Sequence, residues 1–375
     1  MKVEQSSLLG MLGAPDTRFT IPAYQRRYAW QERQCEELWL DILRAGRRDE
    51  GHFSGTVLFK EIAPDASDTP ESIRGRGIRE LSIVDGQQRI TTVMLMLAAL
   101  RSYLRTHPEV VIEGFDAEDI EKRYLFADAN EQPIDPSDAA PKLTPSRLDA
   151  ASMKLALAGV PADNIPSHNI SQNLTHFEEL MAKDSFDPRL FIKGLKNLSI
   201  VAAQTTEEDD SQAVFESLNS KGMQLNIADM VRNYLLAGEN YDDQTRFYID
   251  YWTVIEGVFD PDPGSLKLDT MIKAWLSVRF PKVRARTPDD VYSAFKRYYD
   301  DEYAGDLEPV LAELRSFAMV WAENYRYHAV KKFKSMPWAI NGPTTLTSDY
   351  ELKKADDEEY AERVRQELRA MDRNF

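Results

Sequence analysis

The sequence is poor in the residues on which disulfide-rich and metal-cluster proteins depend. It contains one cysteine, Cys35, among 375 residues. A single cysteine forms neither a disulfide framework nor a cysteine-rich metal site, and it suits a reducing compartment. The histidines are also few, namely His52, His107, His168, His176 and His328. None of them lies in a motif that activates water beside a metal ion, so the sequence does not predict an HNH-type nuclease.

Long hydrophobic runs are missing as well. The longest, Val93 to Leu100, is far shorter than the about 20 residues that a membrane-spanning helix needs. Met1 to Gln5 has no apolar secretory core. We therefore expect a soluble, cytoplasmic protein without membrane contacts. With 43% hydrophobic residues the chain can bury a sizeable core, and its length favours two or three domains.

Basic residues are outnumbered by acidic ones, 46 to 62, and the net charge is −16. This sign excludes a protein that coats nucleic acid nonspecifically, so any DNA contact must be local. The basic residues do form clusters: Arg26, Arg27 and Arg33; Arg44, Arg47 and Arg48; Arg74, Arg76 and Arg79; Lys282, Arg284 and Arg286. Solvated surfaces explain most clusters of this kind.

The stretch Leu81–Arg89 organises the rest of the chain. An apolar run, an Asp85-Gly86 turn and a long helix-forming run from Ile90 predict strand, loop and helix N-terminus. Such a corner binds phosphates through free backbone N–H groups and the helix dipole, and the side chains that would face the anion are Gln88, Arg89, Thr91 and Thr92. Asp85 would serve a metal ion or a water molecule, and the amides of Gln87 and Gln88 would orient a nucleophile.

A purely structural interpretation of this corner is equally open. Asp85 would then cap the helix, and Arg89 would pair with an acid at the surface. No Walker sequence is present to decide between the two interpretations.

A second stretch, Ile21–Trp30, combines aromatic and basic residues, namely Tyr24, Gln25, Arg26, Arg27, Tyr28 and Trp30. Aromatic rings stack on bases and arginines hold phosphates, which favours DNA recognition. The alternative is an aromatic corner that packs against the next helix. Gly55, inside the predicted strand His52–Lys60, indicates a close approach of another group.

Tyr124–Phe126 predicts a further strand, and Ala127 to Pro145 predicts a loop. From about Leu148 onward the chain is mainly helical by its apolar spacing, apart from a strand predicted at Leu198–Ala203. Ala213–Leu236 predicts two helices joined by a turn at Gly222. Its polar members are Asn219, Lys221, Asp229, Arg232 and Asn233. Helix caps and surface ion pairs would explain them without any ligand.

Three motifs in this order and spacing resemble one family. They are Ile-Pro-x-Tyr-Gln-Arg-x-Tyr-x-Trp at 21–30, Val-Asp-Gly-Gln-Gln-Arg-x-Thr-Thr at 84–92 and Phe-Glu-x-Leu-Asn-x-x-Gly-x-x-Leu-x-x-x-Asp at 215–229. The chain is similar to the N-terminal domain of the GmrSD and SspE type over roughly residues 8–236. This family serves modification-dependent restriction and DNA-phosphorothioation defence.

The resemblance implies an α+β, mostly helical fold, with a small mixed ParB-like sheet domain followed by a helical domain. We accordingly predict a ParB-like nucleotide-binding domain at 1–126, a helical part completing the pocket at 127–240, and a C-terminal helical region at 241–375. The 84–92 motif resembles the family's nucleotide-hydrolysis motif.

Matching positions therefore inherit roles by resemblance. Catalysis falls to Asp85, Gln87, Gln88 and Arg89, with Asp85 also as metal ligand. Nucleotide binding falls to Gly86, Thr91, Thr92, Asn219, Lys221 and Asp229. DNA binding falls to Tyr24, Gln25, Arg26, Arg27, Tyr28 and Trp30. The implied cofactor is Mg²⁺ with GTP or another nucleoside triphosphate.

The resemblance implies an NTPase that senses modified double-stranded DNA, either phosphorothioate or glucosylated hydroxymethylcytosine. Because no HNH-like motif is present, we expect cleavage by a nuclease domain or subunit absent from this chain, and a homo-oligomer stays open. The alternatives are a regulatory module that binds nucleotide or DNA without hydrolysis, and a nuclease that acts through the ParB-like fold.

Overall fold

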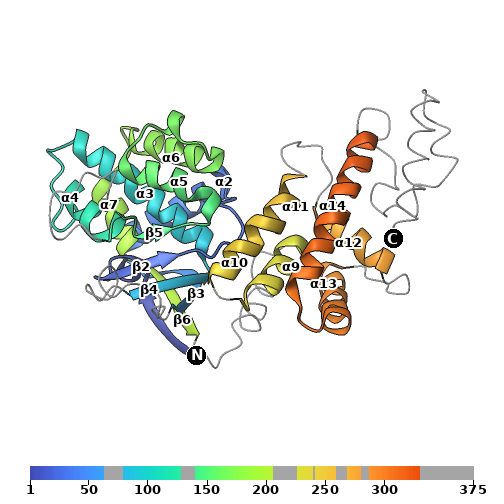
Figure 1. Ribbon diagram of the computed structural model, residues 1–375. Coiled ribbons are helices and arrows are strands. Elements are labelled where there is room, and N and C mark those ends of the chain that lie inside the picture. The colour runs from blue at the N-terminus through green and yellow to red at the C-terminus, as the bar shows by residue number, and fades with distance from the viewer. Residues whose placement is uncertain are drawn as a thin grey trace. The chain divides into compact units, whose positions relative to one another are not determined.

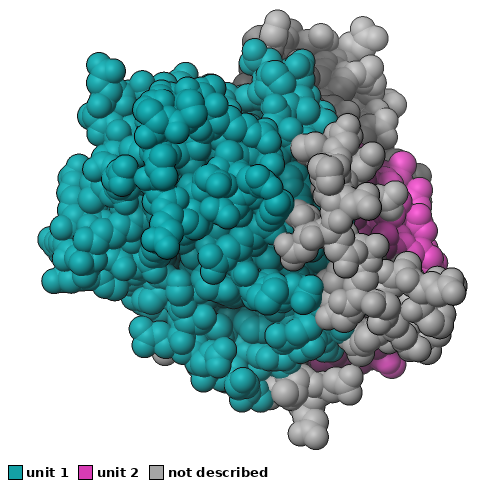
Figure 2. Space-filling view, turned by 90° about the vertical axis from the view of Figure 1, so that its left-hand side faces the viewer, with its two compact units in different colours: residues 1–218 teal, residues 219–375 magenta. Residues whose placement is uncertain are grey.

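A computed structural model describes most of the chain. The described residues are 1–62, 79–127, 140–205, 226–239, 241–258, 268–279 and 287–329. The chain divides into two compact units, unit 1 at residues 1–218 and unit 2 at residues 219–375, which Figure 2 draws in different colours. The predicted boundaries after residues 126 and 240 stay a prediction.

Unit 1 is built on a mixed six-stranded sheet. Its strands are β1 (Lys2–Ser7), β2 (Thr17–Thr20), β3 (His52–Glu61), β4 (Arg79–Asp85), β5 (Leu143–Thr144) and β6 (Leu198–Thr205). Their order is β1-β6-β3-β4-β2-β5. β3 pairs with β6 in parallel and with β4 antiparallel, so β4 lies inside the sheet with its end beside β3.

Helices cover one face of this sheet (Figure 1). They are α1 (Leu8–Leu12), α2 (Glu32–Arg48), α3 (Gln87–Thr106), α4 (Ala117–Ile120), α5 (Arg147–Ala158), α6 (His168–Met181) and α7 (Pro188–Lys196). The central one is α3, whose residues from Ile90 to Leu100 are all buried. A helix that is apolar all round belongs in a core, and this burial fixes the start of α3 relative to the sheet.

One predicted strand is wrong. The sequence predicts an extended Tyr124–Phe126, but residues Glu121–Leu125 form a π-helical turn that continues α4. Only Phe126 is extended, in an isolated bridge to Pro141. The prediction of a strand at Leu198–Ala203 is confirmed by β6.

The described part of unit 2 consists of helices without strands. They are α9 (Ile227–Leu236), α10 (Tyr241–Phe247), α11 (Thr253–Gly257), α12 (Leu268–Arg279), α13 (Pro288–Tyr298) and α14 (Leu307–Ala329), with π-helical turns at Tyr248–Trp252 and Tyr299–Tyr303. Trp252, Trp275 and Trp321 are fully buried. The predicted α+β, mostly helical class is confirmed. Among the described residues, no helix is long and apolar enough to cross a membrane.

Candidate functional site

The candidate site lies where β4 passes into α3. β4 ends at Asp85, and Gly86 is the N-cap of α3 with a left-handed φ of 92°. A Cβ at Gly86 would lie 3.1 Å from the Val57 side chain, so glycine suits both the backbone conformation and the close packing. No side chain caps α3 and its first turn holds no acid. Gly86 offers no side-chain acceptor to the first N–H groups of the helix, and such uncapped groups can donate to an anion.

Three charged side chains converge on this corner. Burial raises the pKa of Asp85, whereas the Gly86 N–H and the charges of Arg89 and Arg26 act to lower it. Burial lowers the pKa of Arg89, and Asp85 opposes that effect. Two guanidinium groups beside one carboxylate leave an excess of one positive charge, which favours an anionic ligand.

Arg89 lies against β3. Its Nη1 donates to the carbonyl oxygen of Thr56 at 3.2 Å. Gly55 has a φ of +99°, and a Cβ there would lie 2.7 Å from Nη2 of Arg89. The strand pairing shifts register between Phe53 and Thr56. The close approach that the sequence indicates at Gly55 is thus made by the Arg89 side chain.

Arg26 brings an unpaired donor. Its Nε is buried and has no hydrogen-bond partner in the described part of the chain. A buried donor without an acceptor destabilises the folded protein. An acceptor oxygen from a ligand would remove this destabilisation.

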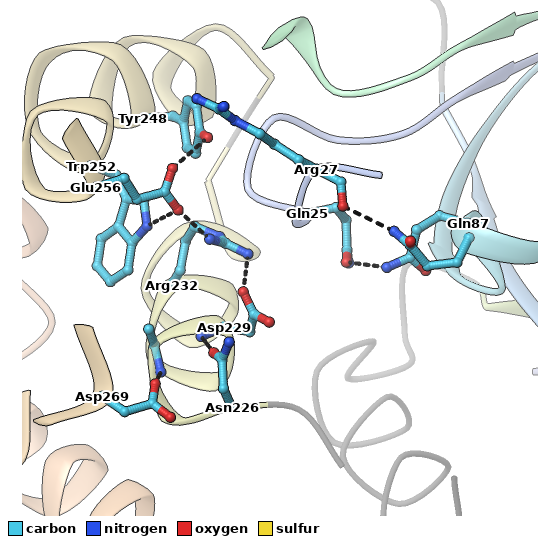
Figure 3. Close-up of polar contacts among 12 residues, drawn as sticks. Gln25, Arg27, Gln87, Asn226, Asp229, Arg232, Tyr248, Trp252, Glu256 and Asp269 are labelled. Atoms are coloured by element: carbon cyan, nitrogen blue, oxygen red, sulfur yellow. Dashed lines mark hydrogen bonds and ion pairs between the residues drawn. The ribbon is translucent and has the colours of Figure 1, made fainter. Parts of the chain in front are cut away.

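The two glutamines of the corner face the Ile21–Trp30 segment. Gln87 Nε2 donates to Gln25 Oε1 at 3.1 Å, as Figure 3 shows. Gln25 Nε2 in turn donates to the Val84 carbonyl at 3.0 Å. Gln88 Oε1 accepts from the backbone N–H of Ala29 at 2.7 Å. Both amides are thus engaged within the protein in this conformation, and their assignment to catalysis stays a prediction.

The aromatic residues of the 21–30 segment are mostly interior. Tyr24 and Tyr28 are buried, and burial raises the pKa of each phenol. The Tyr28 hydroxyl shares a hydrogen bond of 2.7 Å with Thr92 Oγ1. Trp30 is half-buried and Arg27 is exposed. The tyrosines fit the aromatic-corner interpretation, whereas Arg26, Arg27 and Trp30 keep surface for a ligand.

The threonines of the corner do not face a ligand in this conformation. Thr91 and Thr92 are 1% and 0% exposed. Thr92 Oγ1 also donates to the carbonyl of Gln88 at 2.9 Å. Their role in nucleotide binding stays a prediction that this buried position does not favour. The uncapped backbone N–H groups at the start of α3 are the better candidates.

Of the residues predicted from the third motif, Asp229 falls within the described part of the chain. Asn219 and Lys221, with Gly222, fall outside the described residues. Asp229 belongs to α9 of unit 2, is 5% exposed and pairs with Arg232 at 2.6 Å. Arg232 also pairs with Glu256 at 2.6 Å, as Figure 3 shows.

Sequence reasoning missed three residues that hold the 21–30 segment, namely Asp149, Asn169 and Asn173. They lie on α5 and α6, more than 100 positions away in sequence. Asn173 interrupts the apolar pattern of α6 and could have been noticed as a buried polar residue. The pattern gives no indication that its partners are Tyr28 and Trp30.

The fold and the corner define an α+β protein with a positively charged strand-to-helix turn. The family profile described as the GmrSD restriction endonuclease, N-terminal domain, matches residues 8–236. The chain therefore belongs to this family, and the predicted resemblance is confirmed over the same range. No curated protein is similar enough to the chain to be matched with it.

Proposed function

We propose that this restriction-family chain is a nucleoside triphosphatase that senses modified DNA. The observation that carries the proposal is the convergence of Arg89, Arg26 and an uncapped helix N-terminus on a single carboxylate, Asp85. Phosphate transfer needs fixed positive charge near the reacting oxygens more than it needs covalent chemistry.

Each element of the corner then has a role. The N–H groups at the start of α3 would hold phosphate oxygens, and Gly86 would let those oxygens approach the backbone. Arg89 and Arg26 would stabilise the charge that develops on the phosphate and the leaving group. Asp85 would accept a hydrogen bond from the attacking water and orient it.

The residues present fit Mg²⁺ bound together with GTP or another nucleoside triphosphate. Among the described residues there is no group of three or more His, Cys, Asp and Glu side chains that would enclose a metal. Magnesium in nucleotide sites is usually bound by one or two carboxylates and the phosphates, so Asp85 alone suffices. The unpartnered Nε of Arg26 would donate to a phosphate oxygen. When bound, Mg²⁺ neutralises phosphate charge.

DNA would contact the exposed side of the 21–30 segment, through Arg27 and the accessible part of Trp30. Because the net charge is −16, plain duplex should bind weakly and a modification should supply the discrimination. Cleavage would belong to a nuclease domain or subunit other than the residues described.

A regulatory module that binds nucleotide without turnover is the second candidate. The observation in its favour is that the Gln87 and Gln88 amides are engaged with the 21–30 segment. They are therefore not positioned to orient water in this conformation.

The test is phosphate release by the purified protein from GTP and from ATP with Mg²⁺. Each assay is run without DNA, with plain duplex, with phosphorothioate duplex and with duplex carrying glucosylated hydroxymethylcytosine. The proposal predicts release that one modified duplex stimulates. Release at the buffer rate, with nucleotide still raising the melting temperature, would establish the binding module instead. Plasmid nicking with Mg²⁺ that is lost in Asp85→Ala would make the fold itself a nuclease.

A further inference from the structure

The segment from Arg27 to Trp30 has no regular secondary structure, yet side chains pair its backbone. The Gln88 side chain bonds to backbone groups at both ends of it. Its Oε1 accepts from the N–H of Ala29 at 2.7 Å and of Trp30 at 3.2 Å, and its Nε2 donates to the carbonyl of Arg27 at 3.1 Å. One residue at the start of α3 thus fixes both ends of the segment.

Helices α5 and α6 hold three further backbone groups of the segment. The Tyr28 N–H donates to Asp149 Oδ2 at 2.7 Å. Asn169 Nδ2 donates to the Tyr28 carbonyl at 2.9 Å, and Asn173 Nδ2 donates to the Trp30 carbonyl at 2.8 Å. Where an irregular backbone is buried, as at Tyr28, its N–H and C=O groups must find partners of this kind, because unpaired groups are costly.

These partners are themselves rigidly placed. Asp149 and Asn173 are 3% and 0% exposed. Asp149 accepts a second hydrogen bond, from the Ser167 hydroxyl at 3.0 Å, and Asn173 Nδ2 also donates to the Tyr28 hydroxyl at 3.1 Å. Side chains locked by packing and by further hydrogen bonds can fix a loop to a fraction of an ångström.

Arg26 lies between two anchored points. On one side, Gln25 is 2% exposed and bonded to Gln87 and to the Val84 carbonyl. On the other side, the Arg27 carbonyl is held by Gln88. The position of Arg26 beside Asp85 therefore depends on bonds made by its neighbours and not on any hydrogen bond of its Nε.

We propose that Asp149, Asn169 and Asn173 are positioning residues: together with Gln88 they fix the backbone of residues 27–30 and thereby hold Arg26 at the Asp85 corner. The proposal rests on the proposed function for its catalytic consequence. The holding of the segment itself can be measured without any activity.

The test combines amide hydrogen exchange with steady-state kinetics of the full chain. The variants are Asn169→Ala, whose side chain is half-buried, and Asn173→Ala. The control is Asn197→Ala. It removes a similar hydrogen bond of a side-chain amide, from Asn197 Nδ2 to the Ala45 carbonyl at 3.3 Å, away from the segment. Because Asn169 is not fully buried, its variant should fold even if Asn173→Ala does not.

Both test variants should raise the exchange rates of the Tyr28, Ala29 and Trp30 amides at least about tenfold, since local opening exposes them. They should lower kcat for phosphate release about tenfold while KM changes less than about threefold, because misplacement of a charged group acts mainly on the transition state. The control should change neither quantity.

Wild-type exchange rates in both test variants would overturn the proposal. Faster exchange with unchanged kcat would also overturn it, because the segment would then be held without serving the site. If the wild-type protein hydrolyses no nucleotide, the proposed function fails, and the exchange rates by themselves decide whether these side chains hold the segment.

Discussion

Two arginines in the two units show how differently a buried cation can be used. Arg232 in unit 2 is 2% exposed and pairs with Asp229 and Glu256, each at 2.6 Å. Burial alone lowers its pKa, but the two carboxylates outweigh that effect and the pKa is raised. Arg89 in unit 1 is half-buried, donates to one carbonyl, and has a pKa lowered by burial.

The difference shows that Arg232 stabilises the fold, whereas Arg89 can still pair with a ligand. Glu256 also accepts from Trp252 Nε1 at 2.9 Å and from the Tyr248 hydroxyl at 3.1 Å, so the cluster around Arg232 is closed. At the Asp85 corner, by contrast, the charges are only partly compensated. Incomplete compensation in a partly buried site is typical of groups that meet a ligand.

Arg232→Met should have the largest effect. It leaves Asp229 and Glu256 without their cation, and breaking a buried pair in this way costs about 3–5 kcal/mol. Thermal or urea unfolding measures the decrease. The matched control is Arg246→Ala, which breaks the exposed pair with Asp243 and should cost below about 1 kcal/mol. Equal decreases in the two variants would contradict the contrast between a closed cluster and a surface pair.

Gly55→Ala should have the second largest effect, because it disturbs the position of Arg89 at the Asp85 corner. The φ of +99° strains any residue with a Cβ, and the added atom would meet the Arg89 guanidinium at 2.7 Å. We expect a decrease in stability of about 1–3 kcal/mol from the strain and a clear fall in phosphate release. Gly51→Ala is the control, because no atom of the described residues lies within 4 Å of a Cβ there. Normal phosphate release by Gly55→Ala would show that hydrolysis does not depend on the position of the Arg89 side chain.

Arg27→Ala should weaken binding to modified DNA. Removing one arginine that neutralises a phosphate should reduce the salt slope by about one, whatever the sequence of the duplex. Arg33→Ala is the control, since Arg33 pairs with Glu37 on the exposed surface of α2. Gel shifts at several salt concentrations measure both affinity and slope. Wild-type binding by Arg27→Ala would contradict the assignment of this segment to DNA.

The pH dependence should be smaller but has a defined sign. Burial raises the pKa of Asp85, so phosphate release should fall on acidification at a pH above the ordinary aspartate value of about 3.9. Stability changes in the opposite sense, because a raised folded-state pKa contributes stability that is lost as pH rises through it. Asp85→Asn should remove this ionisation from the pH dependence of both rate and melting temperature. A wild-type pH profile in that variant would exclude Asp85.

Local pattern was enough to predict much of unit 1. The strand-loop-helix at Leu81–Arg89 is confirmed by β4 and α3 because apolar run length and the Asp-Gly turn determine it locally. The strand predicted at Tyr124–Phe126 is wrong because the preceding helix continues as a π-helical turn that buries Tyr124 and Leu125. Apolar content alone does not distinguish these two outcomes.

The site was predictable only in its charged members. Asp85 and Arg89 follow from local spacing, whereas their arrangement with Arg26 and Gly55 depends on strand pairing. The partners of the 21–30 segment on α5 and α6 are set by tertiary packing across more than 100 residues. No periodicity in the sequence predicts such pairings.

The most direct test of the corner compares Arg89→Ala with Arg105→Ala in phosphate release. Both arginines lie on α3, but Arg105 is exposed near the helix end and pairs with Glu121 at 2.6 Å. Arg89→Ala should lower kcat by about 10²–10³, as expected on removal of a charge that stabilises the transition state, and should keep a cooperative unfolding transition. Arg105→Ala should retain wild-type turnover. Normal hydrolysis by a folded Arg89→Ala protein would contradict the assignment of this corner as the phosphate site.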